Sequence, residues 1–119
     1  MTFDPDTPIL VQEHPECVVV SLLHDQLIDF DVINATGEAL DALVAEQDHP
    51  NVVLSLPNVK QLSSMAISVL IRTREGCVSK GGTLKLANVS DRVLKVLELA
   101  ALSSVFDFYD TEDEARASL

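Results

Sequence analysis

Aromatic residues are scarce in this chain of 119 residues, where they make up 4% of the sequence, and tryptophan is absent. This scarcity argues against an aromatic stacking platform for single-stranded nucleic acid. The core must instead be built mainly from Leu, Val, Ile and Ala. No apolar run approaches the ~20 residues that a membrane-spanning helix requires. The length predicts a single domain.

Positive charge is also in short supply, because 8 Lys and Arg residues face 19 Asp and Glu residues, for a net charge of −11. A chain of this charge repels phosphate backbones and anionic membrane surfaces at long range. We therefore expect no nucleic-acid partner and no membrane partner. The sequence favours solubility as the reason for this acidity, and a basic protein partner is the alternative.

The two cysteines, Cys17 and Cys77, lie far apart and lack the spacing of a redox pair or a metal site. His14 stands three residues before Cys17, but Cys17 begins an apolar run, which favours a turn histidine beside a buried cysteine. The sequence thus predicts no metal and no cofactor. Residues 1–6 show neither a basic start nor an apolar stretch, so we expect a cytoplasmic protein.

Hydrophobic patterning predicts nine elements. Residues 8–13 form an edge strand, and a turn at residues 14–16 joins it to a buried strand at residues 17–23. Further strands are expected at residues 52–56, 83–89 and 105–109, and helices at residues 31–47, 66–80, 91–101 and 111–119, with Asp31, Ser90 and Thr111 as helix caps. The order β-β-α-β-α-β-α-β-α indicates an α/β fold with a mixed, mostly parallel sheet and helices packed on it. Residues 1–7 are expected to be a flexible N-terminus and residues 8–119 the domain.

Two adjacent serines, Ser63 and Ser64, stand where a strand hands over to the helix at residues 66–80. A catalytic serine is disfavoured, because both glycines of the Gly-x-Ser-x-Gly elbow are missing and nothing links these serines to a histidine. We therefore predict that the chain is not an enzyme. Two roles stay open: a helix cap, worth ~1 kcal/mol, or a phosphate acceptor favoured by the free N–H groups and dipole of the helix start.

The run from residue 51 to residue 115 resembles the STAS family, the anti-sigma factor antagonists and their relatives. The matching features are Gly81-Gly82, the stretch "VLKVLELAAL" at residues 93–102, and the polar ending at residues 110–115. Ala101 stands where the family pattern has glycine. The resemblance covers essentially the whole chain, more weakly in its N-terminal part, and implies a single STAS-like domain.

The sequence departs from the family pattern at its phosphate-acceptor motif, Asp-Ser-Ser/Thr-Gly. Aligned without gaps, Ser63 replaces the Asp, Ser64 matches the first Ser, and Met65 falls on the residue that is phosphorylated. Ala66 replaces the Gly. Methionine has no hydroxyl, so the resemblance implies the fold and a partner-binding surface but leaves Ser64, and after it Ser63, as the phosphoacceptor candidates.

The resemblance implies a regulatory protein-binding module, an anti-sigma factor antagonist whose partner is an anti-sigma factor of the serine-kinase type. Docking is expected through the start of the helix at residues 66–80 and the loops beside it. The partner-binding candidates are Lys60, Gln61, Leu62, Met65, Ser68, Arg72, Asp25 and Asp29, the last forming with Ile28 a pair like the family's Leu-Asp. The alternative is a STAS scaffold or ligand-binding subunit of a sensor or transport assembly without a phosphate switch. The sequence leaves the oligomeric state open.

Overall fold

The computed structural model describes residues 2–4 and 7–119, with side chains from residue 9 onward. Its main sheet has six strands in the order β1-β2-β3-β5-β7-β8. β1, β2 and β3 pair antiparallel, whereas β3, β5, β7 and β8 pair parallel. The strand bounds are β1 (Thr2–Asp4), β2 (Thr7–Glu13), β3 (Val18–Leu22), β5 (Asn51–Ser55), β7 (Thr83–Ala87) and β8 (Asp107–Tyr109). This arrangement confirms the predicted mixed, mostly parallel α/β sheet.

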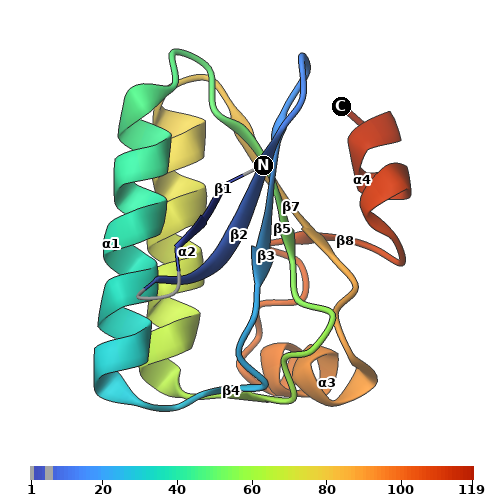
Figure 1. Ribbon diagram of the computed structural model, residues 1–119. Helices are drawn as coiled ribbons and strands as arrows, with labels where there is room; N and C mark the ends of the chain where they lie inside the picture. The colour runs from blue at the N-terminus through green and yellow to red at the C-terminus, as the bar shows by residue number, and fades with distance from the viewer. Residues whose placement is uncertain (1, 5–6) are drawn as a thin grey trace.

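The helices cover the two faces of the sheet unequally (Figure 1). α1 (Phe30–Glu46) and α2 (Ser64–Ser79) lie side by side on one face, and α4 (Glu112–Ala117) lies on the other. α3 (Asp91–Leu99) closes the end of the sheet at which α1 and α2 begin. Val52 and Leu54 belong to the main core, while Val53 packs with Ala115 of α4. Burial on both faces of the sheet explains why β5 is apolar at residues 52–54, without the alternation of a half-exposed strand.

α1 and α2 approach each other closely at Gly37. A Cβ atom on this glycine would lie 2.8 Å from Nη2 of Arg72. Arg72 crosses α1 at this point, and its Nη2 atom lies 3.3 Å from Oδ2 of Asp41. The glycine costs helix propensity but leaves room between the helices for the side chains of Arg72 and Val69.

Three short strands were not predicted: β1, β4 (Gln26–Leu27) and β6 (Gln61–Leu62). β4 and β6 form a separate two-stranded parallel sheet. The predicted flexible N-terminus at residues 1–7 stays a prediction, and its residues 1, 5 and 6 lie outside the described residues.

The predicted cap of the first helix, Asp31, is wrong. Asp29 caps α1: its Oδ1 atom accepts hydrogen bonds from the N–H groups of Asp31, at 2.9 Å, and Val32, at 3.2 Å. Asp29 is extended, with φ −78° and ψ 128°, which is the usual geometry of an N-cap. The helix therefore begins at Phe30, and Asp31 lies in its first turn.

The other predicted helix signals are confirmed. Ser90 and Thr111 accept hydrogen bonds from the N–H groups of Val93, at 3.2 Å, and Glu114, at 3.1 Å. Gly81 follows α2 with φ +78°, a conformation that suits glycine.

Ala101 has an unusual backbone for a residue with a side chain, because its φ is 61°. Its N–H donates to the carbonyl of Glu98, and the N–H of Leu102 donates to that of Leu97. This bonding is the Schellman type of helix end, in which glycine is the preferred residue. The geometry gives a physical reason for the glycine that the STAS pattern has at this position.

We expect Ala101→Gly to raise the free energy of unfolding by about 1 kcal/mol, because glycine removes the steric cost of the left-handed conformation. Urea unfolding followed by circular dichroism measures the change. Ala100→Gly is the matched control, because Ala100 has φ −84° and glycine there only adds flexibility. Equal destabilisation by the two substitutions would contradict the explanation.

Candidate functional site

The two serines at the start of α2 have different environments. Ser63 is the N-cap, and its Oγ atom accepts a hydrogen bond from the N–H of Ala66 at 3.2 Å. Ser64 is the first residue of the helix and is exposed. Within the part of the chain that the structure describes, the Ser64 hydroxyl has no hydrogen-bond partner. Ser63 is therefore occupied as a cap, whereas Ser64 is available to a partner or an enzyme.

β4 and β6 tie the loop before α1 to the chain before α2. The N–H of Lys60 donates to the carbonyl of Asp25 at 2.6 Å, and the N–H of Ser63 donates to that of Leu27 at 3.0 Å. The strand register places Gln26 opposite Gln61. The predicted candidates Asp25, Asp29, Lys60, Gln61, Leu62 and Met65 are thus brought to the one end of the molecule where both long helices begin (Figure 1).

The remaining candidates lie along α2. Ser68 is exposed, and its hydroxyl donates to the carbonyl of Ser64 at 3.1 Å. Arg72 lies seven residues beyond Met65, or about 10 Å along the axis, and pairs with Asp41. Met65 itself is half-buried and packs against the main core. The structure therefore does not bring Arg72 to the start of α2.

Two exposed apolar side chains in the same region were missed by the sequence prediction. The sequence prediction includes Ile28 only as part of a pair with Asp29 and does not include Phe30, yet their side chains are 54% and 65% exposed. Asp29 and Asp31 flank Phe30 in the chain. An aromatic residue between two aspartates, in a chain with few aromatics, was the signal that could have identified it.

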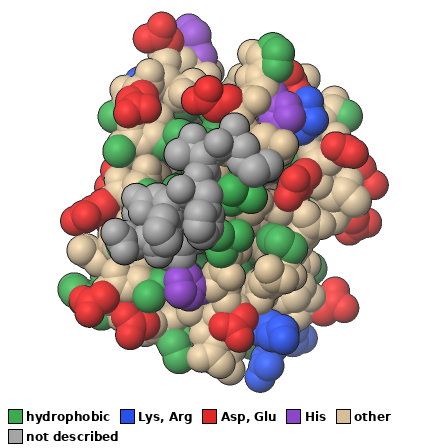
Figure 2. Space-filling view, in the orientation of Figure 1, with side chains coloured by type: hydrophobic (Ala, Val, Ile, Leu, Met, Phe, Trp, Pro, Cys, Tyr) green, Lys and Arg blue, Asp and Glu red, His purple; other side chains and the backbone are tan. Residues whose placement is uncertain are grey.

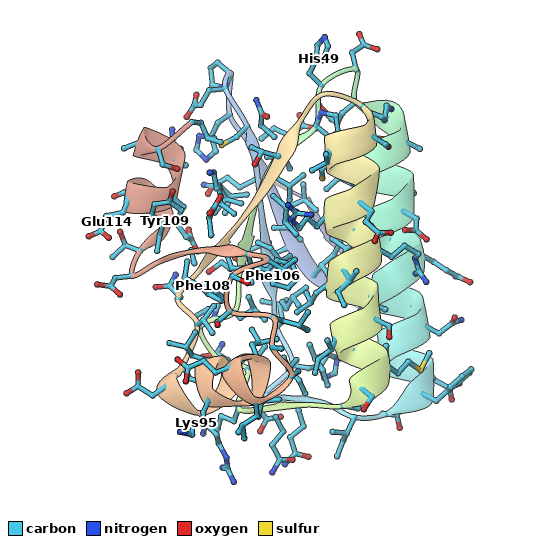
Figure 3. All side chains as sticks on the ribbon, turned by 180° about the vertical axis from the view of Figure 1, so that it is seen from behind. His49, Lys95, Phe106, Phe108, Tyr109 and Glu114 are labelled. Carbon is cyan, nitrogen blue, oxygen red and sulfur yellow. The ribbon has the colours of Figure 1, made fainter. Side chains whose placement is uncertain are left out.

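The described residues offer little for catalysis. Burial raises the pKa of the Cys77 thiol to about 11 and also raises that of Cys17, so neither is a ready nucleophile. His49 lies at the end of the molecule opposite the start of α2 (Figure 3), where its Nδ1 atom is 3.2 Å from the carbonyl of Lys80. Among the side chains that the structure describes, from residue 9 onward, no three from His, Cys, Asp or Glu are placed to hold a metal ion.

Among the described residues, no helix combines the length and the apolar character needed to cross a membrane.

The fold and the exposed helix start define a small α/β module whose accessible features suit contact with a protein. The STAS domain model matches residues 8–115, and the chain belongs to the STAS domain family. The family is non-enzymatic, as the sequence predicts.

Three relatives illustrate the similarity. An anti-sigma F factor antagonist from Paenibacillus polymyxa is 24% identical over 107 residues, which is 90% of this chain and 91% of that protein. An anti-sigma factor antagonist from Mycobacterium paratuberculosis is 28% identical, with a TM-score of 0.78 over 97% of this chain and 96% of that one. A STAS domain protein from Planctomyces limnophilus, an anti-sigma-factor antagonist by its description, is 20% identical, with a TM-score of 0.82 over 92% and 96% of the two chains.

Alanine substitutions distinguish the roles of the two serines, because they should change the free energy of unfolding by different amounts. We expect Ser63→Ala to lower the free energy of unfolding by about 1 kcal/mol, since it removes the cap of α2. Ser64→Ala should change it by less than about 0.5 kcal/mol, because the residue is exposed and its hydroxyl bonds to none of the described residues. Urea unfolding of the two variants is the measurement, and a larger loss for Ser64→Ala would show that the cap is misassigned.

Proposed function

We propose that the chain is an anti-sigma factor antagonist that binds an anti-sigma factor of the serine-kinase type. The docking surface is the start of α2 together with the paired segments at β4 and β6. The observation that carries this proposal is the hydroxyl of Ser64, which is exposed at the start of α2 and has no hydrogen-bond partner among the described residues. The similarity to the antagonists from Paenibacillus polymyxa and Mycobacterium paratuberculosis supports the same assignment.

The surface has the chemistry of a protein interface. Ile28 and Phe30 offer exposed apolar anchors, and the exposed residues Asp25, Asp29 and Asp31 lie close to them in the chain. Interfaces combine an apolar centre with a polar rim, and complementary charge steers association. A partner with basic side chains around an apolar pocket fits this part of the surface.

Ser64 is the proposed phosphate acceptor. The N–H groups of Ser64 and Met65 are among the four that a helix leaves without an internal partner. α2 has no acidic residue in its first turn, whereas α1, α3 and α4 each have at least one. A phosphate on Ser64 meets the positive end of a helix dipole that no acidic side chain in that turn already neutralises.

Phosphorylation at this position changes docking through charge. The group adds about −1.5 to −2 charges. These charges come close to the helix start, on a surface whose other edge already carries Asp25 and Asp29. A partner that binds the unmodified surface through basic and apolar contacts then meets a more negative and more hydrated one, so its affinity changes.

The test is intact mass spectrometry after incubation with ATP and each serine-kinase anti-sigma factor encoded in the same genome. We expect the chain to gain the mass of one phosphate and peptide mapping to place it on Ser64. Ser64→Ala should abolish the gain, and Ser63→Ala should retain it, because Ser63 is engaged as the cap. Stable binding without phosphate transfer would indicate a module without the switch, and the absence of both would overturn the proposal.

The alternative function is a STAS scaffold or ligand-binding subunit without a phosphate switch. Met65 favours it, because it puts a half-buried side chain without a hydroxyl where the family is phosphorylated. A groove of about 220 Å³ between α1 and α2, lined in part by Asp41, Arg72 and Lys80, could be tested for ligands. However, Arg72 is paired with Asp41, and Lys80 donates hydrogen bonds to carbonyls of α1. The two cationic side chains that line the groove are therefore already engaged.

A further inference from the structure

Half of the cationic side chains have structural contacts. Of the 8 Lys and Arg residues, Arg72, Lys85 and Arg116 form ion pairs with carboxylates. Lys80 donates to the carbonyls of Val44 and Ala45 at the end of α1, at 3.1 and 3.0 Å. The other four have no ion pair within the part of the chain that the structure describes, and they are Lys60, Arg74, Arg92 and Lys95.

Three of these four unpaired cations lie at one end of the molecule. Arg92 and Lys95 are exposed on α3, and Lys60 is exposed just before β6. The cap of α3 touches the chain beside Lys60, because the Ser90 hydroxyl lies 3.4 Å from the carbonyl of Val59. Figure 2 shows Lys and Arg side chains over α3 at this end and acidic side chains over the start of α1, and Figure 3 labels Lys95 on α3.

The exposed face of α3 continues with an apolar residue. Arg92, Lys95 and Leu99 follow one another at i, i+3 and i+7, so they share a face of the helix. The opposite face carries Val93 and Leu97, which are buried. Leu99 is 78% exposed, the largest value among the large hydrophobic side chains of the described residues. These three residues form the α3 stripe.

We propose that the α3 stripe, together with Lys60, docks an acidic segment of the protein partner that contacts the start of α2. The inference rests on the proposed function and adds the chemistry of a second contact. Charge complementarity selects the occupant: two adjacent cations with an apolar side chain one turn further fit an acidic segment that carries an apolar residue. Nucleic acid and anionic lipid present extended arrays of negative charge, which the net charge of −11 repels at long range, whereas a short acidic segment belongs to a partner that other contacts hold at the start of α2.

The experiment measures partner affinity for matched charge reversals by isothermal titration calorimetry at low and high salt. We expect Lys95→Glu to weaken binding about tenfold at low salt and Arg92→Glu to act similarly, because each places like charges opposite each other. Arg74→Glu is the control, since it makes the same charge change at an unpaired cation in the middle of α2. Leu99→Ser should weaken binding with little salt dependence. Thermal unfolding of each variant verifies that the domain is intact.

The outcomes separate the two proposals. Binding by the wild type with equal affinities for Lys95→Glu and Arg74→Glu would overturn the α3 contact and leave the proposed function standing. Failure of the wild type to bind any serine-kinase anti-sigma factor would overturn the proposed function and this inference with it. Sedimentation showing a wild-type dimer that Lys95→Glu dissociates would assign the stripe to a second copy of the chain instead, which also overturns the inference.

Discussion

The pairing of β4 with β6 is the constraint on which the functional end of the molecule depends. Each strand has only two residues, which is too short to be stable alone. Buried side chains hold the pair in place: Leu27 at 3% exposure on one side, and Val59 at 1% just before the other. With both anchored, the carbonyls of Asp25 and Leu27 accept N–H groups from the chain before α2. The starts of α1 and α2 are thereby fixed beside each other, and an apolar, acidic loop borders the exposed serine.

Met65 and Ser64 present different surfaces although they are neighbours. Successive helix residues are separated by about 100° around the axis, so their side chains point in different directions. The Met65 side chain turns partly into the core, and the Ser64 side chain turns to solvent. A phosphate on Ser64 would therefore occupy another position around the helix than one at the family's acceptor.

The sequence predicts the large elements well because they have strong periodic or composition signals. Apart from Ser55, residues 52–56 are apolar; Ser90 and Thr111 are good caps, and Gly81-Gly82 follows the end of α2. The strand, the caps and the helix end are all found. β4 and β6 were not predicted, because a strand of two residues gives no periodic signal and the two strands pair only once the chain has folded. The cap of α1 was misplaced because Asp29 and Asp31 are equally good caps by residue type, and only the hydrogen bonds of Asp29 decide. The α3 stripe was missed because a lone pair of cations on a helix is ordinary until the ion pairs elsewhere are known.

The paired cations join elements that are distant in sequence, and the unpaired ones do not. Arg116 bonds Glu16 and lowers the pKa of that carboxyl, linking α4 to the turn between β2 and β3. Lys85 bonds Asp107 at 2.9 Å across β7 and β8, and this bond raises the pKa of the lysine. Lys60, Arg92 and Lys95 form no such ionic link within the described residues, so reversing their charge removes no ion pair from the fold. Because the chain has 19 Asp and Glu residues against 8 Lys and Arg residues, an acidic segment of a partner would meet attraction mainly over α3. Basic groups of the same partner meet attraction over the start of α1. Opposite charges at the two sides of one end would therefore orient a partner across Ser64 as well as attract it.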